Sequence, residues 1–572
     1  MPSELDRRLA SAMARLTAPG TPFEIGSIDR DGGARLPIFR HAPESLPALF
    51  DTFCAQHGDA EFLIDGTIRL SFAEVHALAR RVAAGLVSRH GVRRGDRIAI
   101  AARNSANWII AYMGVLMAGG CVTLLNGWWS GEELASGIAL PDCALVLADP
   151  QRMHRLAQIS LSARPLSARI VPFDHGEPEQ GLARLLGADD AEWRPPELTR
   201  GDLARIMFTS GSTGTAKAAV SDHQAIVQAT YNFAAQSLMA FMAEAPEGAL
   251  PPPQSGLVGV PLFHVTGEIA LFLQSFVLGR RLVIMPKWDA REAMHLIERE
   301  RITFFAGVPL MSLEIAMHPS RAHYDLSSCT SFAAGGAPRP AEHVAQLRQA
   351  LPDAALYIGY GLTETNCTGC CNIADNYIAK PGSTGPASAP LVEIAVLGPD
   401  GDPLPTGLRG EIALRSICNF RGYWGNPEET AAALRRDGFF LTGDLGYLDE
   451  DGYLFVVDRK KDIIIRGGEN IASTEVEQAI YAHPGVAEAS VFGLPHDRYG
   501  EVPVAVYSIK DGHRLSEDEL LRHLATRIAA FKVPVRLWRE DDALPRLGTE
   551  KIDKLTLKAR YSRAWEVAKG AP

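Results

Sequence analysis

The 572-residue chain is poor in cysteine, has no excess of basic charge and lacks the apolar N-terminal core of a signal peptide. Eight cysteines at irregular spacing argue against a disulfide-stabilised secreted protein and predict a reduced, cytoplasmic setting. The first segment, MPSELDRRLASAMARL, carries charges at Glu4, Asp6 and Arg7, where a signal peptide would be apolar. Lys and Arg number 57 against 67 Asp and Glu, a net charge of −10, which argues against nucleic acid as a partner.

Long apolar runs are also scarce. The stretch Trp108–Leu125 has 18 apolar or uncharged residues, the length at which a transmembrane helix becomes an alternative. Gly119 and Gly120 interrupt it, and Asn104 is placed to cap a helix that starts just before it. We therefore expect a buried helix followed by a buried strand, and no transmembrane segment.

The remaining composition, 47% hydrophobic and 22% charged, is that of a globular protein with room for several domains. Short β-branched runs alternate with amphipathic stretches between about residues 60 and 360, which predicts layered α/β structure with largely parallel sheets. Turns rich in Gly, Pro and Asp separate the short apolar segments after residue 390 and indicate a β-rich subdomain. The last part of the chain has a small α+β pattern.

The predicted fold class is therefore α/β: a large N-terminal domain of layered α/β sheets plus a β-rich subdomain, with a small mobile α+β C-terminal domain. The predicted boundaries are an N-terminal extension at 1–45, an N-terminal domain at 46–457 with its β-rich subdomain at about 385–457, a hinge at 458–461 and a C-terminal domain at 462–572. Within the extension, Leu5, Leu9, Met13 and Leu16 recur at helical spacing, which favours a docking face over a membrane anchor.

The most informative segment is FTSGSTGTAK, from Phe208 to Lys217, which follows a predicted buried strand. Its glycines allow tight turns with exposed backbone amides, its hydroxyls add donors, and Lys217 adds a positive charge, so the loop suits phosphate groups. It is not a Walker A loop, because that motif needs Gly-Lys followed by Ser or Thr, whereas Ala216 precedes the lysine here. On these residues alone, a flexible Ser/Gly loop remains the alternative.

Six further segments follow this loop along the chain: PLFH (261–264), AAGGAP (333–338), GYGLTET (359–365), TGDLG (442–446), DRKKDIIIRGGEN (458–470) and LPRLGTEKIDK (544–554). In identity and order they resemble the motifs of the adenylate-forming (AMP-dependent synthetase/ligase) superfamily, which includes acyl-CoA synthetases, luciferases and peptide-synthetase adenylation domains. The resemblance spans about residues 45–565 and fits the acyl-CoA synthetase branch best.

The resemblance implies an ATP site. The residues it assigns to the phosphates are Thr209, Ser210, Gly211, Ser212, Thr213, Gly214 and Lys217. The residues it assigns to the adenine are Gly335, Gly336, Ala337 and Tyr360, and those it assigns to the ribose are Asp444 with Arg459. Small backbone and a flat ring suit a base, and a carboxylate suits two ribose hydroxyls, although an isolated Asp in a Gly turn is more often a turn former.

The catalytic residues implied by the resemblance are Lys551, Thr363, Glu364 and His264. Glu364 is a hard oxygen donor suited to magnesium, and Thr363 can hydrogen-bond the α-phosphate. His264 is assigned a positioning role between the acyl pocket and the nucleotide. Base catalysis by His264 is the weaker hypothesis, because a carboxylate substrate is already ionised at neutral pH.

Lys551 is expected to stabilise the charge that develops when a carboxylate attacks a phosphorus atom. The match to the family is imperfect here, because Leu547 stands where Thr is usual and Glu550 stands where Gly is usual. Lys554 is the nearby alternative, but the register through Pro545 favours Lys551.

The remaining assignments concern the second substrate and the acid. The residues expected to line the acyl pocket are Tyr231, Gly307 and Cys367, and small residues there favour a medium- or long-chain fatty acid or a bulky ring acid. Cys367, Cys370 and Cys371 contain a CxxC spacing, for which pocket lining is favoured over metal or redox roles.

The segment RGGEN resembles the CoA-ligase version of its motif, with Gly467 and Gly468 leaving a channel for the pantetheine arm. An ordinary glycine turn is the alternative for this pair. The resemblance also places the hinge at Lys461.

The sequence thus predicts an acid–thiol ligase that joins a carboxylic acid to CoA through an acyl-adenylate, with ATP, magnesium and CoA as cofactor or co-substrates. Two rival functions remain: an adenylation enzyme that loads an acyl carrier protein, and a non-catalytic acyl-adenylate or nucleotide-binding protein. A homodimer is left open.

Overall fold

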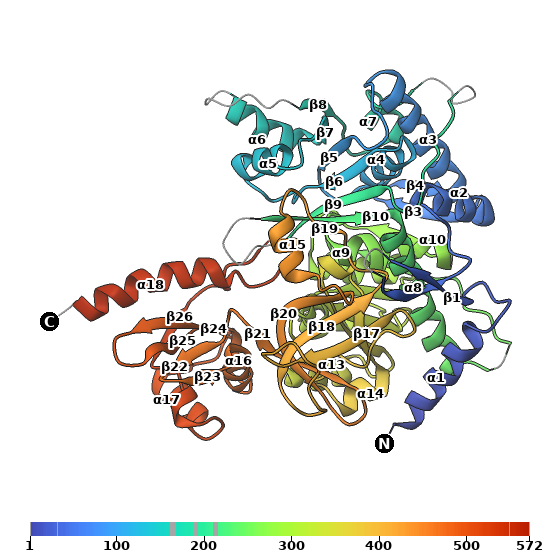
Figure 1. The fold of residues 1–572 in the computed structure, drawn as a ribbon. Coiled ribbons are helices and arrows are strands. Elements are labelled where there is room, and N and C mark those ends of the chain that lie inside the picture. The colour runs from blue at the N-terminus through green and yellow to red at the C-terminus, as the bar shows by residue number, and fades with distance from the viewer. Residues whose placement is uncertain are drawn as a thin grey trace.

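The computed structural model describes residues 2–30, 33–160, 168–187, 193–209, 216–246, 248–547 and 550–570. It contains two large sheets with their helices, a smaller antiparallel sheet and a separate C-terminal domain (Figure 1). This arrangement confirms the predicted fold class.

The first large sheet is parallel at its centre, with two antiparallel strands at one edge. In spatial order its strands are β19 (Gly422–Tyr423), β10 (Lys217–Asp222), β9 (Leu203–Thr209), β6 (Cys121–Leu124), β5 (Arg97–Ala101), β7 (Leu145–Ala148) and β8 (Arg169–Pro172). Strands buried on both faces read as continuous apolar runs, which is why these segments could be found in the sequence.

The second large sheet has parallel strands between antiparallel edges. In spatial order its strands are β16 (Gly369–Ile373), β15 (Ala355–Gly361), β14 (Ser331–Gly335), β13 (Phe304–Gly307), β11 (Ser255–Val258), β12 (Arg281–Ile284), β3 (Glu61–Asp65) and β4 (Ile68–Ser71). Because the parallel strands share one direction, the loops that follow β13, β14 and β15 meet at one edge of the sheet.

Helices between the two sheets contribute to one hydrophobic core with both of them. These are α2 (Leu46–His57), α3 (Phe72–Ser88), α4 (Ala106–Met117), α8 (His223–Glu244), the π-helix η2 (Glu268–Leu273) and α10 (Gln274–Leu278). Further helices cover the outer faces: α5 (Gly131–Ala139) and α6 (Pro150–Ser160) on the first sheet, and α11 (Ala290–Arg299), α12 (Pro309–Met317), α13 (Ala341–Ala350) and α14 (Ala374–Ala379) on the second. The short helix α7 (Pro178–Gly181) contacts α4.

A buried ion pair crosses this core. Arg205 of β9 and Glu268 at the start of η2 are both fully buried and in direct contact. The Tyr112 hydroxyl of α4 donates to Glu268 Oε1 over 2.6 Å, and the Arg205 guanidinium donates to the side-chain oxygen of Asn366, after β15. One polar cluster therefore connects the first sheet, the helical layer and the second sheet.

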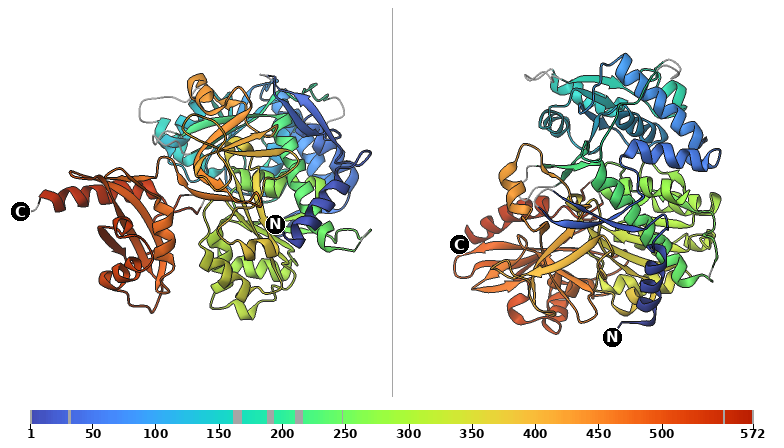
Figure 2. Two further views of the ribbon diagram at one scale, coloured as in Figure 1. Left: turned by 60° about the horizontal axis from the view of Figure 1, so that its bottom comes forward. Right: turned by 45° about the vertical axis from the view of Figure 1, so that its right-hand side comes forward.

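The N-terminal residues pack onto this body. Helix α1 (Glu4–Leu16) lies along α8, with Leu5 and Met13 buried, which confirms its apolar stripe as a docking face (Figure 2). Asp6 accepts hydrogen bonds at Oδ1 from the Tyr453 hydroxyl (2.7 Å) and the Asn376 amide (2.8 Å). A two-stranded hairpin follows, β1 (Ile25–Asp29) and β2 (Arg35–Phe39).

The β-rich part is a four-stranded antiparallel sheet, and the C-terminal domain has a five-stranded sheet with its own core. The four-stranded sheet comprises β17 (Val392–Leu397), β18 (Gly410–Ser416), β20 (Phe439–Leu448) and β21 (Leu454–Arg459). The C-terminal elements are β22 (Ile464–Arg466), β23 (Glu469–Ile471), α16 (Ser473–Tyr481), β24 (Val486–His496), β25 (Gly500–Ile509), α17 (Glu517–Ala525), β26 (Arg536–Glu540) and α18 (Lys554–Gly570). Figure 2 shows this domain standing beside the large body.

The apolar stretch near residue 110 forms α4 followed by β6, as expected, but its predicted cap was wrong. Ser105, not Asn104, accepts the hydrogen bond from the Trp108 amide. Asn104 instead donates to the Val260 carbonyl and accepts from the Leu262 amide. These two buried backbone groups need hydrogen-bond partners, and the Asn104 side chain supplies both. Among the described residues, no helix is long and apolar enough to cross a membrane.

The Arg205–Glu268 pair predicts a measurable stability effect. Replacing Glu268 by Gln leaves the buried guanidinium without its anion, so we expect unfolding to become about 3–5 kcal/mol easier, visible as a lower melting temperature. The double variant Arg205→Met with Glu268→Leu should recover most of that loss, because both charges are then gone. A melting curve of Glu268→Gln equal to that of the parent chain would contradict this account.

Candidate active site

A continuous cavity of about 3020 Å³ lies where the large domain faces the C-terminal domain. It opens at the loops that follow β13, β14 and β15, and it reaches β20, β21 and the loop before α18. The predicted site residues that line it are Thr209, Lys217, His264, Gly307, Gly335, Gly336, Ala337, Tyr360, Thr363, Glu364, Cys367, Asp444, Arg459, Lys461 and Lys551. Five predicted phosphate-loop residues, Ser210, Gly211, Ser212, Thr213 and Gly214, lie outside the described part of the chain.

Asp444 is held in place from two sides. It lies opposite Arg459 in the β20–β21 register, with Arg459 Nε 3.3 Å from its Oδ1. The Tyr360 hydroxyl donates to its Oδ2 over 2.7 Å. Burial raises the pKa of the Asp444 carboxyl, and the Arg459 guanidinium opposes that shift. The result is a fixed acceptor beside the aromatic ring and the small backbone of Gly335–Ala337.

Glu364 lies in the short turn η4 (Thr363–Thr365) and is only 7% exposed. Its Oε1 accepts a hydrogen bond from the Tyr423 hydroxyl over 2.9 Å. Lys217 lies 5.1 Å from the centre of the same Tyr423 ring, and its amine pairs with Glu429 at 2.7 Å. Tyr423 therefore connects the lysine of the phosphate loop to the acid of the TET motif. Sequence reasoning missed this tyrosine.

The residues present fit a magnesium ion that is held mainly by substrate. Among the described residues, no group of three or more His, Cys, Asp or Glu side chains could hold a metal by itself. Magnesium commonly uses one or two carboxylates together with substrate phosphates, so a single carboxylate at the cavity wall suffices. Burial raises the pKa of Glu364, while Tyr423, Arg459 and Lys217 favour its charged form.

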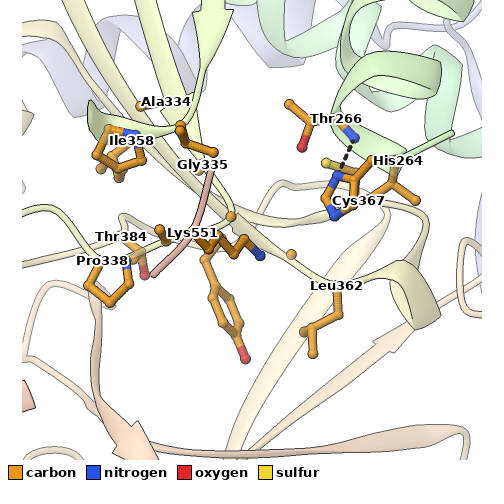
Figure 3. A pocket seen from close by; sticks show the side chains of 18 of the residues that line it. His264, Thr266, Ala334, Gly335, Pro338, Ile358, Leu362, Cys367, Thr384 and Lys551 are labelled. Carbon is orange, nitrogen blue, oxygen red and sulfur yellow. Dashed lines mark hydrogen bonds between the residues drawn. The ribbon is translucent and has the colours of Figure 1, made fainter. Parts of the chain in front are cut away.

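Lys551 reaches the cavity from the C-terminal domain. A Cβ placed on Gly336 would lie 3.6 Å from Lys551 Nζ, so the amine lies directly against the predicted adenine loop. Figure 3 shows the lysine below Gly335, with its amine extending towards the side where His264 and Cys367 lie. Burial, together with nearby Arg459, lowers the pKa of Lys551 to about 8, while Asp444 opposes the shift.

The loop before Lys551 explains the departure at Glu550. The backbone amide of Leu547 donates to the Lys551 carbonyl over 2.7 Å, and that of Glu550 donates to Leu547 over 2.9 Å. This tight turn gives Glu550 a φ of +61°, a conformation that favours glycine. Glu550 adopts this left-handed conformation at a cost of roughly 1–2 kcal/mol. The turn therefore forms with a glutamate at the position where the family usually has glycine. Lys554, the alternative lysine, instead pairs with Glu477 at 3.0 Å inside the C-terminal domain.

His264 lines the cavity at the point where the sequence predicts a wall between acyl pocket and nucleotide. Its Nδ1 accepts from the Thr266 backbone amide over 3.4 Å, which closes the start of α9 (Val265–Gly267) (Figure 3). Burial lowers the pKa of His264 to about 3, with Lys551 and Arg205 adding to the effect. The ring is therefore neutral at physiological pH, and its geometry suits positioning better than proton transfer.

Of the three residues predicted for the acyl pocket, Cys367 and Gly307 line the cavity, whereas Tyr231 does not. Tyr231 points the other way, and its ring packs 5.5 Å from Phe23 and 6.0 Å from Phe39. The prediction for Tyr231 was wrong because apolar residues occur on all sides of α8. The sequence of this helix therefore does not indicate which of its faces lines the cavity. The neighbouring Asn232 faces it instead.

Gly467 and Gly468 form the turn between β22 and β23, with φ values of +58° and +92°. They do not line the cavity in this arrangement. The predicted CoA channel at this pair therefore requires a different placement of the C-terminal domain, and it remains a proposal.

The comparisons with known proteins identify the family. Residues 50–424 match the family profile described as AMP-binding enzyme, and residues 475–551 match the AMP-binding enzyme C-terminal domain. The first match alone covers more than half of the chain, so the chain belongs to the AMP-binding enzyme family, as its motifs predicted.

A feruloyl-CoA synthase from Amycolatopsis sp is 35% identical over 500 residues, which cover 87% of this chain and 95% of that protein. A long-chain-fatty-acid–CoA ligase from Bacillus subtilis (strain 168) is 32% identical over 511 residues, covering 85% of this chain and 89% of that protein. The crystal structure of ATP-bound MatB from Rhodopseudomonas palustris is similar with a TM-score of 0.79 and 29% identity, covering 91% of this chain and 99% of that one. The names of these relatives confirm the predicted enzyme class, an AMP-forming acid–thiol ligase.

The lowered pKa of Lys551 predicts a pH dependence. Lys551 carries its charge below about pH 8 and loses it above, so kcat/KM for the ATP-dependent step should fall as the pH rises through about 8. Arginine stays charged throughout, so Lys551→Arg should lose activity overall but also lose this alkaline fall. Pyrophosphate release measured from about pH 6 to about pH 10 tests both expectations. Identical profiles for the two proteins would exclude Lys551 as the titrating group.

Proposed function

We propose that this protein is an ATP-dependent carboxylic acid–CoA ligase. The observation that carries the proposal is the position of Lys551, against Gly336 and in one cavity with Asp444, Glu364 and Lys217. This arrangement gathers a ribose acceptor, a magnesium ligand and two cationic groups around the place where an ATP would have its phosphates.

In the first half-reaction, a carboxylate oxygen of the acid attacks the α-phosphorus of ATP, and the bond to the pyrophosphate oxygen breaks. Two anions approach each other in this step, so the charge of Lys551 favours the transition state more than the ground state. Thr363 can donate to the α-phosphate, and Asp444 fixes the ribose. Bound magnesium, with Glu364 as its protein ligand, would neutralise phosphate charge.

In the second half-reaction, the CoA thiol attacks the acyl carbonyl and AMP leaves. Lys551 occupies the cavity in the present arrangement, so we propose that the C-terminal domain turns about the segment 458–461, with Lys461 at the hinge. That turn would withdraw Lys551 and bring Gly467 and Gly468 to the cavity. Their exposed hairpin turn, free of side chains, supports this assignment.

The acid is proposed to be a medium- or long-chain fatty acid or a bulky ring acid. Small residues at the acyl end, including Gly307 and Cys367, leave room for such a substrate. The names of the relatives, a feruloyl-CoA synthase and a long-chain-fatty-acid–CoA ligase, cover both kinds of acid.

The direct test is pyrophosphate release with a panel of carboxylic acids, each measured with and without CoA. Release together with an acyl-CoA product is expected. Release without acyl-CoA under any condition would favour an enzyme that loads a carrier protein. No release with any acid would favour a non-catalytic binding protein.

Two variants should separate the half-reactions. Lys551→Ala should lose adenylate formation by at least about a hundredfold, because the charge between the two anions is gone, yet keep thioester formation from supplied acyl-AMP. Lys461→Pro should show the reverse pattern, since a rigid φ at the hinge hinders the turn of the domain. Equal losses of both steps in Lys551→Ala would remove its assigned role, and unchanged kinetics in Lys461→Pro would exclude this hinge.

A further inference from the structure

The cavity continues beyond the reacting end, between α8, the η2–α10 segment and the strands β13 and β14. Its reacting end lies at Gly307 and Gly335, the carboxyl ends of those strands, and its far end lies at Thr303 and Ser331. Three to four residues of extended strand separate the two ends, a distance of roughly 10–13 Å. The far end is not an apolar wall. Its polar lining residues include Asn232, Gln236, Gln254, Gln274 and Arg280.

Arg280 is the central feature of this far end, and it is only 2% exposed. Its Nε and one terminal nitrogen donate to Gln254 Oε1 over 3.0 and 2.8 Å, and its other terminal nitrogen donates to Gln274 Oε1 over 3.2 Å. The guanidinium also lies over the Phe304 ring, 4.3 Å from its centre. Burial lowers the pKa of Arg280 to about 9, so it still carries its charge at neutral pH.

None of these partners is an anion. Among the described residues, no carboxylate pairs with Arg280, although a buried cation normally needs one. A guanidinium has five N–H groups, and the two amide oxygens accept three of them. Both glutamines are neutral, and Gln274 is itself fixed by donating to the Phe233 carbonyl and Ser237. The charge is therefore oriented, but it is not neutralised.

A second side chain at this cavity has an unsatisfied polar atom. The side-chain oxygen of Asn232 is buried, and no hydrogen bond to it is found within the described ranges. Asn232 lines the cavity from α8, across from the strands. A saturated hydrocarbon tail would leave the Asn232 oxygen without a hydrogen bond and the Arg280 charge without an anion, which costs free energy.

The next residue provides the contrast. Arg281, the first residue of β12, does not line the cavity and pairs with Glu61 at 2.9 Å. The chain thus neutralises one arginine of the pair with its own carboxylate and leaves the other facing the substrate cavity.

We infer that the acid carries a second carboxylate at the end remote from the reacting one, and that Arg280 binds it, oriented by Gln254 and Gln274. This inference rests on the proposed ligase function and specifies its substrate class. Arg280 is then a specificity residue about 10 Å or more from the chemistry. The distal carboxylate is the anion that the buried guanidinium lacks, and its two oxygens can accept the remaining N–H groups.

The test compares straight-chain dicarboxylic acids of about eight to ten carbons, a length near that of the cavity, with monocarboxylic acids of equal length. The readout is kcat/KM from pyrophosphate release. The wild-type protein should prefer the dicarboxylic acid by about tenfold to a hundredfold. Arg280→Met should lose or invert that preference while still using the monocarboxylic acid, which also shows that the variant is folded. Arg280→Lys keeps the charge and should keep part of the preference.

Arg281→Met is the matched control and should leave the preference unchanged, because Arg281 does not face the cavity. A wild-type preference for monocarboxylic acids, or an unchanged ratio in Arg280→Met, would overturn the inference while leaving the ligase function intact. Absence of pyrophosphate release with every acid would instead overturn the proposed function, and this inference with it.

Discussion

The contact between Arg205 and Glu268 is the constraint on which the site depends. Two opposite charges in a dry core are tolerated only when they meet with good geometry and with their remaining groups hydrogen-bonded. Tyr112 and Asn366 supply those bonds. Because the four residues come from β9, η2, α4 and the loop after β15, satisfying the pair also fixes how the two large sheets are placed.

The position of the short turn η4 (Thr363–Thr365) depends on this cluster of buried polar residues. Asn366 and Cys367 both have positive φ values, +50° and +67°, which cost free energy for residues with a Cβ. The bonds from Arg205 to Asn366, and from the Asn366 amide to the Cys418 carbonyl, hold this turn in place. Glu364 precedes the strained pair by two residues, so the same bonds direct its carboxylate to the cavity wall. Buried residues of the two large sheets thereby determine where Glu364, the proposed magnesium ligand, lies.

The fold and much of the site could be predicted from the sequence for one physical reason. Buried parallel strands are uninterrupted apolar runs, and glycine-rich or polar motifs mark the loops at their carboxyl ends. Strand β5 (Arg97–Ala101) is one of the short apolar runs expected between about residues 60 and 360, and residues of most motifs line one cavity.

Contacts between distant segments could not be predicted in this way. Tyr423 meets Glu364 only because β19 joins the edge of the first sheet, and Tyr231 turns away because of the rotation of α8. The position of Gly467 and Gly468 depends on the orientation of the C-terminal domain relative to the large domain, which local sequence does not specify. The sequence did carry a weak signal for the buried charges, since Glu268 and Arg205 are single charges in apolar segments. Arg280 and Arg281 are adjacent where β12 begins, and neighbouring side chains of extended backbone point to opposite sides.

The hydrogen bond between Asp6 and Tyr453 has a consequence for how the chain folds during its synthesis. Helix α1 is synthesised before every other described element, yet its hydrogen bond is to a side chain 447 residues further along the chain. Its apolar stripe packs on α8, so that face stays exposed while the intervening chain emerges from the ribosome. Docking of α1 must therefore wait at least for α8, and the bond to Tyr453 can form only once most of the large domain has been made.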